Sequence, residues 1–271
     1  MDFEQYKGKY QLTPLEETEQ SWTFFVEKNG ETRICKRYPR QLDRFREEMA
    51  YLYIGERNLL NIPNLFFIGE DFIEMEFING ETPTTKDTIQ NISLMYTKTK
   101  DLSHPKGYFP KIDLSKSKIY KRLEYLPREL EKRKFLDQQL IHDILSFTES
   151  SYDPSKHQCL VHGDLKSPHI IKTKNRIYFI DLALISVANP WYDLAFLFME
   201  EKNKNGLLER LSYESYEFLG ESFNVHMEEV QNYLKSNIFY RLLYNVIFAA
   251  RHRSDKSLIR TINELQQILN E

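Results

Sequence analysis

Apolar and polar residues alternate in short runs over the first forty residues, which is typical of strands rather than helices. An apolar run from Trp22 to Val26 leads into Asn29-Gly30, a pair that favours a two-residue turn. A second run follows from Arg33 to Tyr38. Residues 9–38 are therefore predicted to form antiparallel strands with a hairpin at Asn29-Gly30.

The pattern changes after residue 40, where apolar side chains recur every three or four positions. These positions are Leu42, Phe45, Met49 and Leu52. They predict a helix over residues 41–54. Pro63 then interrupts the chain, and two more strands are predicted at Leu65–Ile68 and Phe72–Phe77. The N-terminal part is thus expected to hold five strands and one helix.

Helical spacing dominates the rest of the chain. Helices are predicted within residues 87–102, 115–149 and 227–271, and the last segment carries one continuous apolar face. The members of that face are Phe239, Leu242, Leu243, Val246, Ile247 and Ala250.

Both periodicities stop near residue 80, where Asn79-Gly80 and Pro83 favour a break. A chain of 271 residues is long enough for two lobes. The predicted domains are therefore residues 1–80 and residues 81–271.

Composition narrows the class of protein. The net charge of −3 gives no basic field that would favour a nucleic-acid partner. Cys35 and Cys159 lie inside apparent strands and are predicted to be buried free thiols, not disulfide partners or zinc ligands. The N-terminus has no apolar signal segment, and no apolar run approaches the roughly 18 residues of a membrane span. A cytoplasmic protein without a membrane span is expected.

The chemistry is concentrated at His162-Gly163-Asp164-Leu165 and at Asp181. Ile170-Ile171 follows the first segment, and Ile177 to Ile180 runs directly into Asp181. This order predicts a loop with one carboxylate, a short hairpin, and a second carboxylate at the end of its return strand. Two carboxylates held in that way suit phosphoryl transfer.

These segments resemble the catalytic and metal-binding segments of the protein-kinase-like superfamily. Gly163, where protein kinases have Arg, points to the aminoglycoside phosphotransferase and choline kinase branch, and Asp193-Leu194-Ala195 matches its third motif. The resemblance implies an α+β, two-lobed protein-kinase-like fold. Its small N-terminal lobe would hold an antiparallel sheet with one helix, and its larger C-terminal lobe would be mainly helical. It also implies ATP and Mg²⁺ as cofactors.

The resemblance assigns a role to each residue of these motifs. Asp164 would be the catalytic base, and Asp181 would bind Mg²⁺. Lys166 would neutralise charge on the γ-phosphate, although an exposed loop lysine is an equal alternative. His162 would brace the loop, and Asp193 would cap it.

Further expected nucleotide contacts lie in the N-terminal part. Lys36 would grip the α- and β-phosphates, and either Glu47 or Glu48 would form the ion pair that steadies it. Glu48 is preferred because it lies one turn before Leu52. The base would be read by backbone groups of a hinge. These groups belong to Glu76, Phe77 and Ile78.

Two features depart from the pattern of the family. His169 stands where the family has a metal-binding Asn, and an imidazole is a softer ligand than the oxygen that Mg²⁺ prefers, so Mn²⁺ is an alternative metal. The expected phosphate loop, Leu15 to Ser21, has no glycine and three glutamates. Thr18 or Ser21 would have to contact the phosphates instead.

The preferred interpretation is an ATP-dependent kinase that phosphorylates a hydroxyl of a small molecule. An amino sugar or amino alcohol is the first expectation for the acceptor, read by the helices after Asp193. One alternative is a pseudokinase that acts as a binding or scaffold protein. Another is a kinase of lipopolysaccharide-type sugars or of proteins. The choice between ATP and GTP and the oligomeric state stay open at this point.

Overall fold

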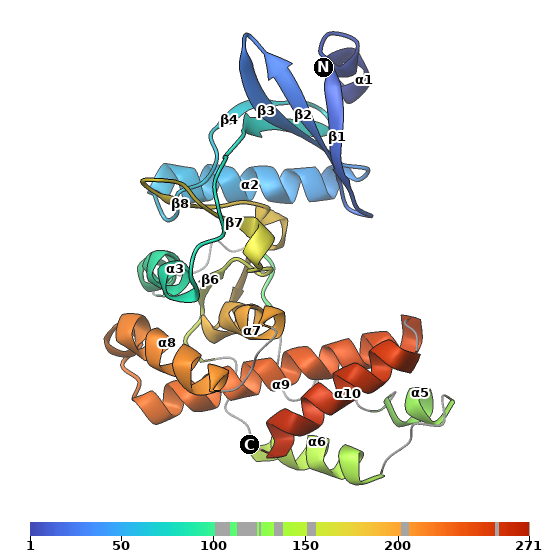
Figure 1. Ribbon diagram of the computed structural model, residues 1–271, viewed down its shortest axis with the longest axis vertical. Helices are drawn as coiled ribbons and strands as arrows, with labels where there is room; N and C mark the ends of the chain where they lie inside the picture. The colour runs from blue at the N-terminus through green and yellow to red at the C-terminus, as the bar shows by residue number, and fades with distance from the viewer. Residues whose placement is uncertain are drawn as a thin grey trace. The chain divides into compact units, whose positions relative to one another are not determined.

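The computed structural model divides the chain into two compact units (Figure 1). It describes residues 1–100, 109–112, 124, 126–132, 138–150, 156–201, 206–252 and 255–270. The first unit comprises Met1–Pro110 with His162–Ser186, and the second comprises Lys111–Val161 with Val187–Glu271. The segment with the candidate catalytic residues therefore packs with the N-terminal sheet. The lobe boundary expected at residue 80 stays a prediction.

A five-stranded antiparallel sheet forms the centre of the first unit. Its strands are β1 (Leu12–Glu17), β2 (Trp22–Lys28), β3 (Glu31–Arg37), β4 (Leu65–Ile68) and β5 (Phe72–Glu76). They lie in the order β1-β2-β3-β5-β4. The hairpin turn at Asn29-Gly30 is confirmed, and both residues have the positive φ that this turn requires, 55° and 80°. The five strands predicted for the N-terminal part are all present.

One face of the sheet is covered by a short helix that the sequence analysis did not predict, α1 (Phe3–Lys7). A capping box at Asp2 starts it. Phe3 and Tyr6 are buried against the β-strand residues Cys35 and Phe72. The sequence does not predict α1 because five residues are too few to show helical periodicity.

The other face of the sheet meets α2 (Gln41–Arg57). The predicted helix is confirmed, but its apolar stripe lies outward: Leu42 is 56% exposed and Phe45 48%. The buried side of α2 instead carries Glu47 and Tyr51. Glu47 is buried because it faces Lys36 of β3, whose side chain points away from the face that carries Cys35.

The catalytic segment forms the predicted hairpin. It consists of a 3-10 turn η1 (Ser167–His169), β7 (Ile170–Lys172), β8 (Ile177–Phe179) and a second 3-10 turn η2 (Leu182–Leu184). Backbone hydrogen bonds between Glu81 and Lys172, at 2.9 and 2.7 Å, fasten β7 to the chain that follows β5. A Cβ at Gly80 would lie 2.3 Å from the Lys172 carbonyl oxygen, so only glycine permits this approach. The helix α3 (Thr85–Thr99) completes the first unit.

The second unit is mainly helical. Its elements are β6 (Cys159–Val161), β9 (Ser186–Ala188, begun by the last residue of the first unit), α5 (Leu126–Lys132), α6 (Gln138–Ser150), α7 (Trp191–Glu200), α8 (Leu207–Phe223), α9 (Met227–His252) and α10 (Asp255–Asn270). The apolar face predicted on α9 is confirmed, since all six of its members are buried. Part of the helix predicted over 115–149 lies outside the described residues.

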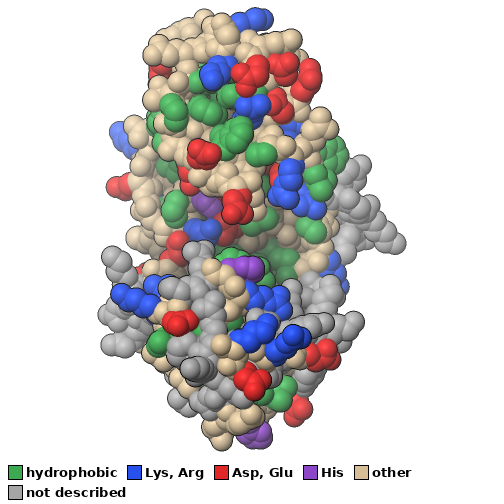
Figure 2. All heavy atoms as spheres, turned by 90° about the vertical axis from the view of Figure 1, so that its right-hand side faces the viewer, with side chains coloured by type: hydrophobic (Ala, Val, Ile, Leu, Met, Phe, Trp, Pro, Cys, Tyr) green, Lys and Arg blue, Asp and Glu red, His purple; other side chains and the backbone are tan. Residues whose placement is uncertain are grey.

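Both cysteines are buried free thiols, as predicted. Burial raises the pKa of each thiol, which keeps both protonated. Within the described ranges, no helix is long and apolar enough to cross a lipid bilayer. Acidic, basic and apolar side chains are interspersed over the face shown in Figure 2, in keeping with the small net charge.

Candidate active site

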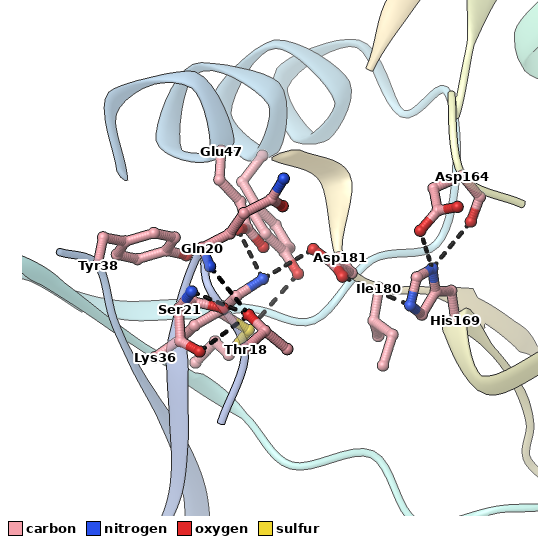
Figure 3. A network of polar contacts seen from close by, with 12 residues as sticks. Thr18, Gln20, Ser21, Lys36, Tyr38, Glu47, Asp164, His169, Ile180 and Asp181 are labelled. Atoms are coloured by element: carbon pink, nitrogen blue, oxygen red, sulfur yellow. Dashed lines mark hydrogen bonds and ion pairs between the residues drawn. The ribbon is translucent and has the colours of Figure 1, made fainter. Parts of the chain in front are cut away.

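Lys36 connects two elements of the first unit through its ammonium group (Figure 3). The Nζ atom donates to Glu47 Oε2 of α2 at 2.8 Å and to Asp181 Oδ1, just before η2, at 2.7 Å. Lys36 and Glu47 are both buried. Lys36, Glu47 and Asp181 thus form one cluster, and the predicted pairing of Lys36 with a glutamate is present in it.

The preference for Glu48 as the partner of Lys36 was wrong. Glu48 accepts a hydrogen bond from Arg44 at 2.6 Å on the same helix, whereas Glu47 points inward. Neighbouring helical residues are about 100° apart around the axis, so only one of them can face β3. The spacing from Leu52 misled the choice because that leucine marks the exposed side of α2.

Burial and charge act against each other in this cluster. Burial alone would lower the pKa of Lys36, but Glu47 and Asp181 outweigh it and raise that pKa. Burial alone would raise the pKa of Asp181, but the Lys36 ammonium holds it below its ordinary value. The pKa of Glu47 is raised by burial despite Lys36. The charged forms of Lys36 and Asp181 therefore stabilise each other.

Two tyrosines that sequence reasoning missed complete the cluster. Tyr38 donates its hydroxyl to Glu47 Oε2 at 2.8 Å, and Tyr51 donates to the sulfur of Met75 at 3.5 Å. Burial raises the pKa of both phenols, so they remain neutral donors. Their spacing was a usable signal. Tyr51 lies one helical turn after Glu47, and Tyr38 lies on the same face of the sheet as Lys36.

The loop that carries Asp164 is fixed by its backbone and by His162. Gly163 has φ 84°, and a Cβ there would lie 2.0 Å from the Leu184 carbonyl oxygen, so no other residue fits. His162 is fully buried, and its Nε2 lies 2.9 Å from the Ile180 carbonyl oxygen. Because a carbonyl only accepts, Nε2 carries the proton, which leaves Nδ1 to accept from the Asp164 amide at 3.4 Å. Burial lowers the pKa of His162 to about 4.

His169 lies between the two carboxylates (Figure 3). Its Nδ1 is 2.8 Å from the Asp164 carbonyl oxygen, and its Nε2 is 3.4 Å from Asp181 Oδ2. In the neutral ring the carbonyl fixes the proton on Nδ1, so the Nε2 lone pair faces the carboxylate. Two electron-pair donors that face each other in this way are arranged to hold a cation.

Lys166 is paired with the candidate base. Its Nζ donates to Asp164 Oδ2 at 2.6 Å, and its side chain is 42% exposed. The lysine is therefore both exposed and adjacent to Asp164, so an ammonium group already lies beside the oxygen that would take the proton.

The turn between β1 and β2 is held by Thr18. Its hydroxyl oxygen accepts from the amides of Gln20 and Ser21, at 3.2 and 3.0 Å, and donates to the Ser21 carbonyl at 3.1 Å. Two amides of the expected phosphate loop are thus directed at a side chain of the loop itself. Ser21 is buried at the end of this turn.

The expected base-reading residues lie at the end of β5: Glu76 is its last residue, and Phe77 and Ile78 follow it. The Glu76 carboxylate accepts from the Asn64 side chain at 2.7 Å, and the Glu76 amide donates to the Asn64 carbonyl at 2.9 Å. The backbone N–H of Glu76 is thus used within the protein, and the prediction that Glu76, Phe77 and Ile78 read a base stays a prediction.

A cavity of about 710 Å³ connects these groups, and all of its lining residues belong to the first unit. The predicted site residues that line it are Ser21, Lys36, Glu76, Phe77, Ile78, Asp164, Lys166, His169 and Asp181. Glu47 lines it as well, and Glu48 does not. A volume of this size is that of a small-molecule site.

Asp181 and His169 are the pair of side chains placed to hold a metal. No group of three or more such side chains gathers anywhere in the described part of the chain. Mg²⁺ commonly takes only one or two protein ligands and completes its shell with phosphate oxygens and water. The pair therefore fits a metal that binds together with a nucleotide. The nitrogen donor makes Mn²⁺ at least as suitable.

One curated relative, "Protein LicA homolog" from Mycoplasma capricolum subsp. capricolum, is 29% identical over 167 residues, which are 58% of this chain and 65% of the relative. The chain thus spans somewhat less than two thirds of that protein.

Solved structures match over nearly the whole chain. The ADP-bound aminoglycoside phosphotransferase APH(2'')-Ib has a TM-score of 0.70 at 19% identity, with 99% of this chain and 98% of that one covered. A choline kinase from Cryptosporidium parvum Iowa II has a TM-score of 0.67 at 15% identity, with 97% and 90% covered. At this identity the likeness shows the fold, and it confirms the α+β, kinase-like architecture.

The model of a family described as "Phosphotransferase enzyme family" matches residues 11–215, about three quarters of the chain. This range includes the whole candidate site. The chain therefore belongs to the phosphotransferase enzyme family.

Proposed function

We propose that the protein transfers the γ-phosphate of ATP to a hydroxyl group of a small molecule. The observation that carries this proposal is that Lys36, Asp164 and Asp181 line one cavity, with Lys36 and Asp181 in direct contact. Phosphoryl transfer needs this combination of a fixed cation, a proton acceptor and a metal-binding carboxylate.

In the proposed reaction, Asp164 accepts the proton of the acceptor hydroxyl. The hydroxyl oxygen forms a bond to the γ-phosphorus as the bond from that phosphorus to the bridging oxygen breaks, and ADP leaves with that oxygen. Lys166 lies 2.6 Å from Asp164 and is exposed, so its ammonium group is available to the transferring phosphoryl group.

Lys36 would hold the α- and β-phosphates. Its ammonium is fixed by Glu47, and Glu47 in turn by Tyr38, so the charge has its position before the nucleotide binds. Asp181 and His169 would hold the metal, which would neutralise charge on the phosphates. Phe77 and Ile78 would read the base.

The acceptor is proposed to be a small molecule because the chain has little room for peptide recognition. Only twelve positions separate Asp181 from Asp193, and Pro190 and Trp191 occupy part of them. A long activation loop that binds a peptide does not fit this interval. Amino sugars and amino alcohols are the first acceptors to test, in line with the aminoglycoside phosphotransferases and choline kinase that share the fold.

A second candidate function is that of a pseudokinase, which would act as a binding or scaffold protein without using a nucleotide. The observation that favours it is the turn between β1 and β2, where Thr18 occupies two amides and Glu16 and Glu19 line the cavity. Carboxylates repel phosphates, so the turn between β1 and β2 is unfavourable for binding a triphosphate.

The experiment that decides between them measures ATP binding and ATP consumption together. Thermal shift with ATP and either Mg²⁺ or Mn²⁺ tests binding. Consumption is then screened over amino sugars, amino alcohols, nucleosides, neutral sugars, lipopolysaccharide-type sugars and a generic protein. Turnover of a small acceptor supports the proposal, phosphorylation of the protein alone refutes it, and no binding with no turnover favours the pseudokinase.

A further inference from the structure

Arg241, near the middle of α9, lies stacked on aromatic side chains of α7, and both helices belong to the second unit. Its guanidinium carbon is 3.5 Å from the centre of the Phe196 ring and 5.7 Å from that of Tyr192. Its Nη1 donates to the Tyr192 hydroxyl at 3.0 Å. The planar head group is therefore held in one orientation.

Arg241 differs from comparable arginines because no carboxylate among the described residues pairs with it. The described residues include four half-buried arginines, and the other three each contact a carboxylate. These pairs are Arg33 with Glu74 at 2.6 Å, Arg37 with Asp71 at 3.1 Å, and Arg44 with Glu48 at 2.6 Å. In the part of the chain that the structure describes, the side-chain hydrogen bond and ring contacts of Arg241 are all with the two aromatic residues of α7.

The free energy of a half-buried guanidinium depends on what meets its edge. The aromatic rings cover its face, but only one of its five N–H groups donates to Tyr192. Removing a charge from water without a counter-charge is unfavourable. A guanidinium whose plane is fixed by stacking presents its fork to the two oxygens of a carboxylate or a phosphate.

We propose that Arg241 and Tyr192 form a binding site for the carboxylate or phosphate group of a small ligand. Tyr244 and Phe248 follow Arg241 by three and seven positions on the same side of α9, and they are 46% and 40% exposed. They offer apolar contact to the rest of such a ligand. This site goes beyond the proposed kinase activity, and its occupancy does not require turnover.

The test follows the Nε–Hε signal of Arg241 by NMR in the full-length chain, assigned by its absence in Arg241→Lys. Sodium phosphate and sodium acetate are titrated against sodium chloride at equal ionic strength. We expect a saturable shift with phosphate or acetate and none with chloride. Anions that bind in the cavity of the first unit move other signals, so this signal reports the proposed site alone.

Variants sharpen the result. Tyr192→Phe removes one hydroxyl and should weaken anion binding several-fold. Arg241→Met should weaken it about tenfold, as measured by the anion concentration needed for thermal stabilisation. Arg210→Met is the matched control, because Arg210 is an exposed arginine of the same unit that pairs with Glu201 at 3.5 Å. An Arg241 signal that fails to saturate, or equal anion affinity in wild type and Arg241→Met, would overturn the site.

A kinetic arm separates two sources of the anion and rests on the proposed function. Pairs of hydroxylated acceptors with and without a carboxylate or phosphate are compared. If the anion belongs to the acceptor, Arg241→Met should lower kcat/KM about tenfold for the anionic member only, with the KM for ATP unchanged. A saturable NMR titration with no acceptor preference assigns the site to a separate anionic ligand. The NMR result stands even if no acceptor is turned over.

Discussion

Asp164 is the residue on which the proposed chemistry depends most directly. Gly163 and His162 hold its backbone, so its position does not depend on its own charge. Asp164→Asn should keep the loop geometry and lower turnover by roughly 10²–10⁴-fold, because the amide cannot accept the proton. Nucleotide binding should persist. Isothermal titration with ATP and stopped assays of turnover check both parts.

The matched control for Asp164→Asn is Asp143→Asn on α6, since Asp143 accepts a hydrogen bond from Gln139 and does not line the cavity. Asp181→Asn serves as the contrast, because it should weaken metal-dependent nucleotide binding as well. Turnover by Asp164→Asn at the wild-type rate would remove it as the base.

Tyr38 tests whether the position of Lys36 matters apart from its charge. Tyr38→Phe removes the hydrogen bond to Glu47 and leaves the ring in place. A buried hydrogen bond to a charged group contributes roughly 1.5–3 kcal/mol to the free energy of the arrangement that it holds, here the position of Glu47 and Lys36. Nucleotide affinity should fall by about tenfold or more, with a smaller change in kcat. Tyr213→Phe, at a tyrosine that is 63% exposed, should change neither quantity.

His169 decides the metal in the proposed site. His169→Asn replaces a nitrogen donor with an amide oxygen, which Mg²⁺ prefers. The ratio of turnover with Mn²⁺ to turnover with Mg²⁺ should therefore fall relative to wild type. An unchanged ratio would place His169 outside the metal shell and leave it as a brace for the Asp164 carbonyl.

At the scale of elements, α2 provides the sharpest test, since two adjacent glutamates have different partners. Glu47→Gln leaves Lys36 with Asp181 alone, and breaking a buried ion pair costs on the order of 3 kcal/mol of unfolding free energy. Glu48→Gln removes only a pair with Arg44 within the helix, worth less than about 1 kcal/mol. Urea unfolding and kcat/KM should both separate the two variants. Equal losses of unfolding free energy and kcat/KM in the two variants would contradict the assignment of Glu47 as the partner of Lys36.

The elements also show what the sequence can predict. The strands, the hairpin at Asn29-Gly30 and the face of α9 follow from local alternation, and all of them are confirmed. The inward side of α2 does not, because Glu47 is buried against Lys36 of β3 and Tyr51 against Met75 of β5. A periodicity of apolar residues cannot mark buried positions that are polar. The choice between Glu47 and Glu48 failed for this reason.

At the scale of the whole molecule, linear motifs located the site because its carboxylates lie in one short segment. Asp164, His169 and Asp181 span fewer than twenty positions, and the first unit brings Lys36 to them. The supporting contacts of Tyr38 and Thr18 depend on packing between β1, β2, β3 and α2. Local patterns place Tyr38 on the face of Lys36 and Thr18 in the expected phosphate loop, but their hydrogen-bond partners became visible only in the fold.

The buried His162 links the site to the stability of the whole fold. Its pKa is about 4 in the folded protein, below the ordinary value of about 6.5 that the unfolded chain should show. The unfolded state therefore binds more protons between these two values. The stabilising contribution is complete above about pH 6.5 and is lost as the pH falls to about 4, by on the order of 3 kcal/mol.

Urea unfolding of the wild type and of His162→Gln between pH 4.5 and 7 tests this linkage. The unfolding free energy of the wild type should rise more steeply with pH, so the two curves should converge toward acid. His157, whose pKa burial also lowers, is present in both proteins, so its contribution cancels in the comparison. Parallel curves for His162→Gln would show that the fold does not hold this imidazole in its neutral form.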